Sequence, residues 1–246
     1  MALPGRLANA RLTLQIHLLF CLLIAQQTRQ AMKNDTRERL IEAARDLFLR
    51  QGYASTGIAQ ILEAADAGSG SLYYFFPTKE DLLLAVLEWY KANLIPAVVQ
   101  PVFERISDPI ERIFGILAGY RRLLLVSDCE YGCPIGNLAL ELANSHPQAA
   151  KLLAENFTAW RKVMEQCLAE AAGKLPSTVD RDQLALHILV TMEGAVMLAR
   201  TYKEIAPYDA AVTQLRDHFD RLFADATQWQ PTPRQRSKTK PSSKPQ

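Results

Sequence analysis

The feature that most constrains this sequence is a nearly unbroken helical periodicity from Asn34 to Ala226, in which each apolar stripe is bounded by helix start and stop signals. Leu40, Ile41 and Phe48, for example, recur at the spacing of one helix face, and Gly52 follows as a left-handed stop. Only 11 glycines and 13 prolines occur in 246 residues, which argues against a turn-rich β fold. We therefore predict an all-α protein with no strand.

Capping residues place the individual helices. Thr56 is predicted to cap the second helix, and Pro96 to break the fourth, which begins with the capping-box-like sequence at residues 78–81. Asp108 followed by Pro109 is a typical helix start. The predicted helices cover residues 35–51, 57–65, 69–76, 78–95, 108–126, 136–143, 147–172, 180–204 and 208–226.

Composition excludes two classes of protein. With 49% hydrophobic residues the chain can bury a large core and is not a disordered protein, and four scattered cysteines are too few for a disulfide-stabilised miniprotein. The net charge of +2 is unevenly distributed: residues 1–33 hold four basic and no acidic residues, and residues 227–246 hold five and none. Residues 34–226 therefore carry 19 basic against 26 acidic residues, a net charge of −7. Any binding to nucleic acid must then depend on a local surface.

The two ends differ from the rest of the chain. Leu12 to Ala25 is an apolar run preceded by arginines, as in a secretory signal, but Met32 stands just before a clean helix start. We interpret residues 1–33 as a start-site artefact or a disordered extension, and expect residues 227–246 to form a disordered basic tail.

Residues 36–84 carry the outline of a helix-turn-helix, in which two short helices joined by a turn lie between longer ones. The second helix of this motif enters the major groove of DNA, which requires small residues for close approach and polar groups to reach phosphates and bases. Residues of both kinds occur here: Gly68, Ser69, Gly70, Ser71, Tyr73 and Tyr74. Lys79 adds a positive charge at the next helix start, where backbone N–H groups favour a phosphate.

The segment from Thr36 to Leu83 resembles the DNA-binding domain of the tetracycline-repressor (TetR/AcrR) family, through residues 36–44, 47–48, 51–53, 56, 58–59, 64–65 and 70–83 taken in order. The resemblance implies that Thr56 contacts a phosphate and that Tyr73 and Lys79 position the recognition helix. It also implies that four residues face the bases, namely Ser69, Gly70, Ser71 and Tyr74. Asp66, Gly68 and Ser69 depart from the family pattern, so the helix lacks its usual cap and some of its usual charge.

The remainder resembles the family more loosely, through residues 132–142 and a segment that includes Glu193, Gly194, Ala195 and Leu198. The resemblance implies that the latter segment forms a dimerisation helix and that the last two helices of each subunit pair into a four-helix bundle. We therefore expect a helix-turn-helix domain over residues 34–80 and a larger helical effector-binding and dimerisation domain over residues 81–226.

Cys129 and Cys133 lie in a loop before a helix start, where a thiol can have a lowered pKa. One alternative is therefore a repressor that senses oxidants or electrophiles through Cys133, with Cys129; the simpler interpretation is that both are structural. Two cysteines are too few for a zinc site, and no arrangement of catalytic residues or phosphate-binding loop indicates an enzyme. A helical adaptor protein with a vestigial helix-turn-helix is a further alternative.

These observations together predict a cytoplasmic, homodimeric transcription regulator without a cofactor, metal or membrane contact. We expect it to act as a repressor that binds a palindromic operator in double-stranded DNA and is released by a small-molecule effector. The identity of the effector and the regulated genes are left open by the sequence.

Overall fold

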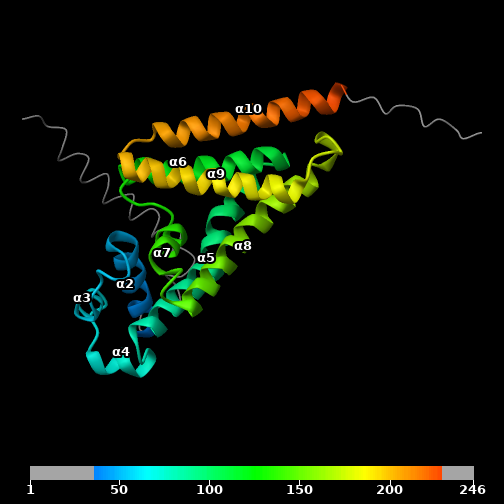
Figure 1. Cartoon of the computed structure of the whole chain (residues 1–246). Coiled ribbons are helices and arrows are strands. Elements are labelled where there is room, and N and C mark those ends of the chain that lie inside the picture. Colours follow the sequence, from blue (N-terminus) through cyan, green and yellow to red (C-terminus); the bar gives the residue numbers. More distant parts are fainter. Residues whose placement is uncertain (1–35, 229–246) are drawn as a thin grey trace, which may run out of the picture.

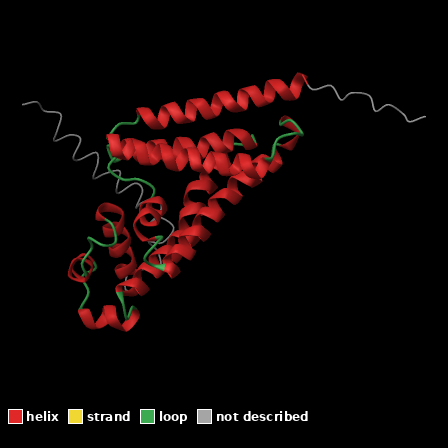
Figure 2. Ribbon diagram, in the orientation of Figure 1, coloured by secondary structure: helices red, strands yellow, loops and turns green. Residues whose placement is uncertain are grey.

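The computed structural model describes residues 36–228, and this part of the chain consists of helices and loops without a strand (Figure 2). The predictions for residues 1–33 and for most of the tail lie outside the described residues. The helices are α2 (Thr36–Gln51), α3 (Ile58–Ala64), α4 (Ser69–Phe75), α5 (Lys79–Arg105), α6 (Pro109–Val126), α7 (Pro134–Leu142), α8 (Pro147–Glu170), α9 (Arg181–Tyr202) and α10 (Ala206–Gln228). The all-α prediction is confirmed.

The first three helices form a small head at one end of the molecule, with α4 farthest from α10 (Figure 1). Its core is the apolar stripe of α2, where Leu40 and Phe48 are fully enclosed, together with Ile61 of α3 and Leu72 of α4. The turn between α3 and α4 places Asp66 in the left-handed region at φ +47°, a conformation that aspartate tolerates through its short polar side chain.

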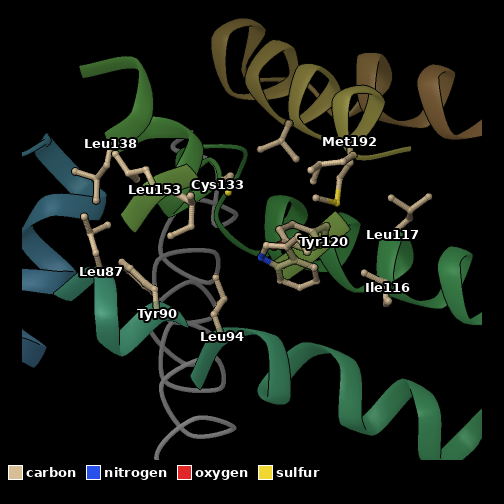
Figure 3. Packing of buried hydrophobic residues seen from close by; sticks show 14 of the residues in the cluster. Leu87, Tyr90, Leu94, Ile116, Leu117, Tyr120, Cys133, Leu138, Leu153 and Met192 are labelled. Atoms are coloured by element: carbon tan, nitrogen blue, oxygen red, sulfur yellow. The ribbon is translucent and has the colours of Figure 1, made fainter. Parts of the chain in front are cut away.

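The end of α5 differs from the sequence prediction. Instead of breaking at Pro96, the helix continues to Arg105 with Pro96 and Pro101 inside it. A proline inside a helix removes one hydrogen bond and costs about 3 kcal/mol or more. The apolar residues on both sides offset that cost by packing on the core, Leu94 before Pro96 and Val98 after it. As a result, the single helix α5 extends from the head into the core formed by the later helices (Figure 3).

Helices α5 to α9 surround the main core. Figure 3 shows side chains from all five converging: Leu87, Tyr90 and Leu94 from α5, Ile116, Leu117 and Tyr120 from α6, Leu138 from α7, Leu153 from α8 and Met192 from α9. The predicted helix start at Asp108 is confirmed, and Asp180, at the predicted start of its helix, caps α9 in the same way: each carboxylate accepts two backbone N–H groups of the helix that it precedes. Helix α10 packs along α9, and the hydroxyl of its buried Tyr208 donates to the carbonyl of Leu117 at 2.8 Å.

Two of the described helices, α5 and α9, are long and apolar enough to cross a membrane by length and composition alone. In this structure each of them packs against α8, so part of their apolar surface serves the helical core.

Candidate nucleic-acid interface

Helix α4 turns one side into the head and the other to solvent. Leu72 is completely buried and Phe76, just after the helix, is nearly so, whereas 55% of the surface of Tyr73 and 80% of that of Tyr74 is exposed. The ring of Tyr74 touches Phe75 edge to face, with centroids 4.9 Å apart. Two adjacent tyrosines thus lie on the surface of a short helix whose inner face is fixed by apolar packing.

The N-terminal end of α4 is open. Gly68 is its N-cap and supplies no side-chain hydrogen bond, so the poor capping expected from the sequence is confirmed. A methyl group added at Gly68 or Gly70 would meet no other atom within 4 Å. Ser69 and Gly70 are exposed and Ser71 is partly exposed, so a duplex could approach the backbone here closely.

The side chain of Thr56 does not cap α3 as the sequence predicted. It is only 1% exposed, and its hydroxyl donates to the carbonyl of Gly52 at 2.6 Å. Gly57 is the N-cap of α3, and its backbone N–H donates to Gln60 Oε1 at 2.8 Å. The prediction that Thr56 caps α3 is therefore wrong by one residue: its side chain turns back to close the α2–α3 loop instead of pointing along α3.

Lys79 begins α5, as predicted, but its ammonium group contacts the protein itself. Nζ donates to the carbonyl of Tyr53 at 2.5 Å and lies 4.1 Å from the centre of the Tyr53 ring. Partial burial lowers the pKa of Lys79, against the nearby carboxylate of Glu141, which acts to raise it. The ammonium has three N–H donors, so a phosphate contact would either add to its hydrogen bond with Tyr53 or replace it.

Other positive charges of the head are also engaged. The guanidinium of Arg37 lies over the Phe76 ring, that of Arg39 donates to the carbonyl of Asp66, and that of Arg45 lies over the Trp89 ring. Residues 36–81 contain five basic and seven acidic residues. The exposed face of α4 is therefore polar and aromatic rather than strongly cationic.

Comparison with known proteins decides the family. Residues 40–86 match the family model described as "Bacterial regulatory proteins, tetR family", and residues 109–215 match "Tetracyclin repressor-like, C-terminal domain". The chain is 30% identical over 180 residues to the HTH-type transcriptional regulator YxaF of Bacillus subtilis, which covers 71% of this chain and 90% of the relative. This chain belongs to the TetR family.

Two further comparisons agree. The HTH-type transcriptional regulator LmrA of Bacillus subtilis is 31% identical over 186 residues, which cover 70% of this chain and 90% of the relative. A solved TetR transcriptional regulator from Chloroflexus aurantiacus is 30% identical and superposes with a TM-score of 0.66, covering 76% of this chain and 94% of its own. The protein is thus a DNA-binding transcriptional regulator of the helix-turn-helix type, and α4 is the second helix of that motif.

The four residues predicted at the dimerisation helix of this TetR-family protein lie on α9 but point in different directions. Ala195 is buried in its own subunit and Glu193 is mostly enclosed, with burial raising the pKa of its carboxyl. Gly194 has open space beyond its Cα, and Leu198 is exposed. Gly194 and Leu198 thus face away from the core, whereas Ala195 packs in the core and Glu193 lies beside α7.

The two cysteines of the thiol-sensor alternative are both buried and unbridged. Cys133 is the N-cap of α7, and its Sγ accepts the backbone N–H of Gly136 at 3.4 Å. Burial, reinforced by the nearby Glu193, nevertheless raises the pKa of Cys133 well above its usual range, and burial also raises that of Cys129. These surroundings favour the unreactive thiol over the thiolate. Within residues 36–228, no three potential metal ligands of the His, Cys, Asp or Glu type lie together.

Sequence reasoning assigned no role to Tyr53 and Glu141, although both lie within the segments that resemble the family. The backbone N–H groups of Tyr53 and Ala54 donate to the Glu141 carboxylate across 87 and 88 residues of sequence. The one feature of the sequence that pointed to this contact was Gly52, which ends α2 and begins a tight loop at residues 52–54.

Proposed function

We propose that this TetR-family protein is a homodimeric repressor that binds a palindromic operator and is released by a small-molecule effector. The observation that carries the DNA-binding part is the surface of α4, where Tyr73 and Tyr74 stand exposed beside the open backbone of residues 68–70. In this proposal Ser69, Gly70, Ser71 and Tyr74 face the bases, while Tyr73 and Lys79 contact the backbone phosphates. The same function places the protein in the cytoplasm, where bacterial DNA lies.

An apolar stripe on α9 supports a homodimer. Leu186, Val190, Met197 and Leu198 are exposed, and with Gly194 they follow one another at helical spacing along one face of the helix. The missing side chain at Gly194 lets a second helix approach closely. Exposed apolar surface of this extent on a folded protein marks an interaction site, and a second copy presents the same complementary stripe. Two heads held in this way would enter successive major grooves about 34–36 Å apart.

The helical core supports an effector site. The hydroxyl of Tyr120 and the amide nitrogen of Asn137 are buried without a hydrogen-bond partner within the described residues. Buried polar groups in proteins are normally paired, so an effector that supplies a partner to the Tyr120 hydroxyl would be favoured there. Because α5 runs from this core to Lys79, a tilt of α5 would reach the recognition helix. A coupling of about 1–3 kcal/mol is typical of allosteric proteins, and a complete switch needs a preference of about 5 kcal/mol between the two states.

A repressor role is supported by names among the relatives. DhaR of Mycobacterium sp. (strain GP1), 25% identical over 183 residues, is named a transcriptional repressor. The operator is palindromic in this proposal because a two-fold symmetric dimer presents two identical heads.

The experiment is to select duplexes that bind the purified protein from fragments of its source genome, and to footprint the selected site. We expect a native mass of two chains and protection of a near-palindrome with two half-sites. A monomer that protects one short non-palindromic site would contradict the proposal. No preference over random duplex at moderate salt would instead favour the adaptor protein with a vestigial helix-turn-helix.

A further inference from the structure

Glu141, near the C-terminal end of α7, connects that helix to the head. Its Oε1 accepts the backbone N–H of Ala54 at 2.5 Å, and its Oε2 accepts the backbone N–H of Tyr53 at 2.9 Å. A carboxylate that accepts two N–H groups makes charge-assisted hydrogen bonds, which are stronger than those between neutral groups. The loop that it holds, residues 52–54, lies between α2 and α3 and leads directly into the helix-turn-helix.

Gly52 lets the carboxylate approach this closely. Its φ of +83° belongs to the left-handed region, and a Cβ at this position would lie 3.0 Å from Glu141 Oε2. Any larger residue would therefore strain the backbone and push the carboxylate away. Glycine at position 52 thus allows both the left-handed backbone and the close approach of the Glu141 carboxylate.

Tyr53 is held from other sides as well. Lys79, the first residue of α5, donates to its carbonyl, and the ring of His146, just before α8, touches its ring edge to face with centroids 5.2 Å apart. The ring of Phe48 in α2 contacts it at 5.3 Å. Residues 52–54 are thus one place where the head meets α5, α7 and the residue before α8, in addition to the packing of α2 on α5, where Arg45 lies over Trp89.

We propose that Glu141 is a positioning residue for DNA binding: by holding residues 52–54 on α7, it fixes the orientation of the head and so the separation of the two recognition helices in the dimer. This inference rests on the proposed homodimeric function. The opposite end of α7 begins at Cys133, beside Glu193 of α9. A displacement of α7 caused in the helical core would therefore be passed to the head through Glu141.

The expected effect follows from the number of heads. If a head without this link takes the productive orientation about one third of the time, both heads of a dimer do so about one ninth of the time, and affinity for a full operator falls about tenfold. A duplex with a single half-site engages one head and requires no fixed separation. The affinity for this duplex should change by less than about twofold, because a single head can reorient freely on its half-site and so loses little by the absence of a fixed orientation.

The test compares Glu141→Ala and Glu141→Gln with the control Glu130→Ala. Glu130 is an exposed carboxylate in the loop before α7, so its removal changes the net charge equally without touching the head. Affinity is titrated by fluorescence anisotropy on the selected full operator and on a duplex with one half-site. We expect E141A to lose about tenfold on the full operator only, E141Q to lose less because one oxygen acceptor is kept, and E130A to match the unchanged protein.

Two results would overturn the inference: E141A that binds the full operator as tightly as the unchanged protein, or equal losses on both duplexes, which would mean that the head itself is damaged. If E141A folds poorly, E141Q and amide hydrogen exchange decide instead. The Tyr53 and Ala54 amides should then exchange faster in E141Q while that of Leu72 is unchanged, and unchanged exchange at all three would refute the link. If the unchanged protein binds no operator, the proposed function itself has failed. This outcome is distinct from a failure of the Glu141 inference, because it does not depend on any substitution.

Discussion

Replacing Tyr74 by alanine tests the recognition helix directly. A tyrosine side chain buries about 150–250 Å² when it is fully enclosed. Because 80% of Tyr74 is exposed in the free protein, nearly all of that area is available to DNA, and its removal should leave the stability of the head within about 0.5 kcal/mol. The substitution therefore separates DNA contact from folding.

The expected loss of binding free energy follows from the area of the Tyr74 ring that DNA covers. If contact with DNA covers about 75 Å² of the ring, the loss at about 25 cal/mol per Å² is about 2 kcal/mol per head. A dimer on a full operator makes the contact twice, so the loss is about 4 kcal/mol, or about 900-fold in affinity. On a duplex with one half-site the same substitution should cost about 30-fold.

The assay is anisotropy titration of Tyr74→Ala on both duplexes at one salt concentration, together with thermal unfolding. Leu140→Ala is the control, because Leu140 is equally exposed but lies on α7. An unchanged operator affinity would remove Tyr74 from the interface. A fall in the unfolding temperature of several degrees would show that the ring supports the head instead of the contact with DNA.

Three further predictions concern the rest of the site. Leu198→Glu should convert dimers to monomers in native mass spectrometry, because it places a charge in the apolar stripe of α9; a stable dimer would place the interface elsewhere. Lys79→Ala should lower operator affinity and reduce the slope of log K against log salt by about 1 per head, whereas an unchanged slope would mean that the lysine stays with Tyr53 in the complex. In the native protein at pH 8, Cys129 and Cys133 should react with iodoacetamide far more slowly than after unfolding, because burial raises the pKa of both thiols and leaves little thiolate. Rapid labelling of native Cys133 would revive the thiol-sensor alternative.

The parts of the fold that the sequence predicted are those set by neighbouring residues. The helix start at Asp108 and the stop at Gly52 both depend on backbone groups a few residues away, so they can be predicted without a structure. The same holds for Leu40 and Phe48, whose burial follows from the spacing of apolar residues in the first predicted helix.

The predictions that failed depended on distant residues. Pro96 was expected to end a helix, but packing of the residues on either side of it outweighs the missing hydrogen bond. The dimerisation role that the resemblance implies for positions 193 and 195 of α9 stays a prediction, because a helix apolar on nearly all sides does not show from its sequence which side faces the core. Glu141 received no role from the sequence, because the backbone N–H groups that it binds lie almost ninety residues earlier in the chain and meet it only through the packing of α7 beside the head.

The charge of the head gives its orientation particular importance. With five basic and seven acidic residues over positions 36–81, this part of the protein gains little from general attraction to the phosphate backbone. In the proposed dimer, affinity for an operator therefore depends on direct contacts of α4 and on both heads engaging at once. Simultaneous engagement is sensitive to head separation, since a misplaced second head loses its whole contribution. A weakly charged head of this kind can therefore be released by a small change in orientation, which a short link such as that between α7 and residues 52–54 is able to transmit.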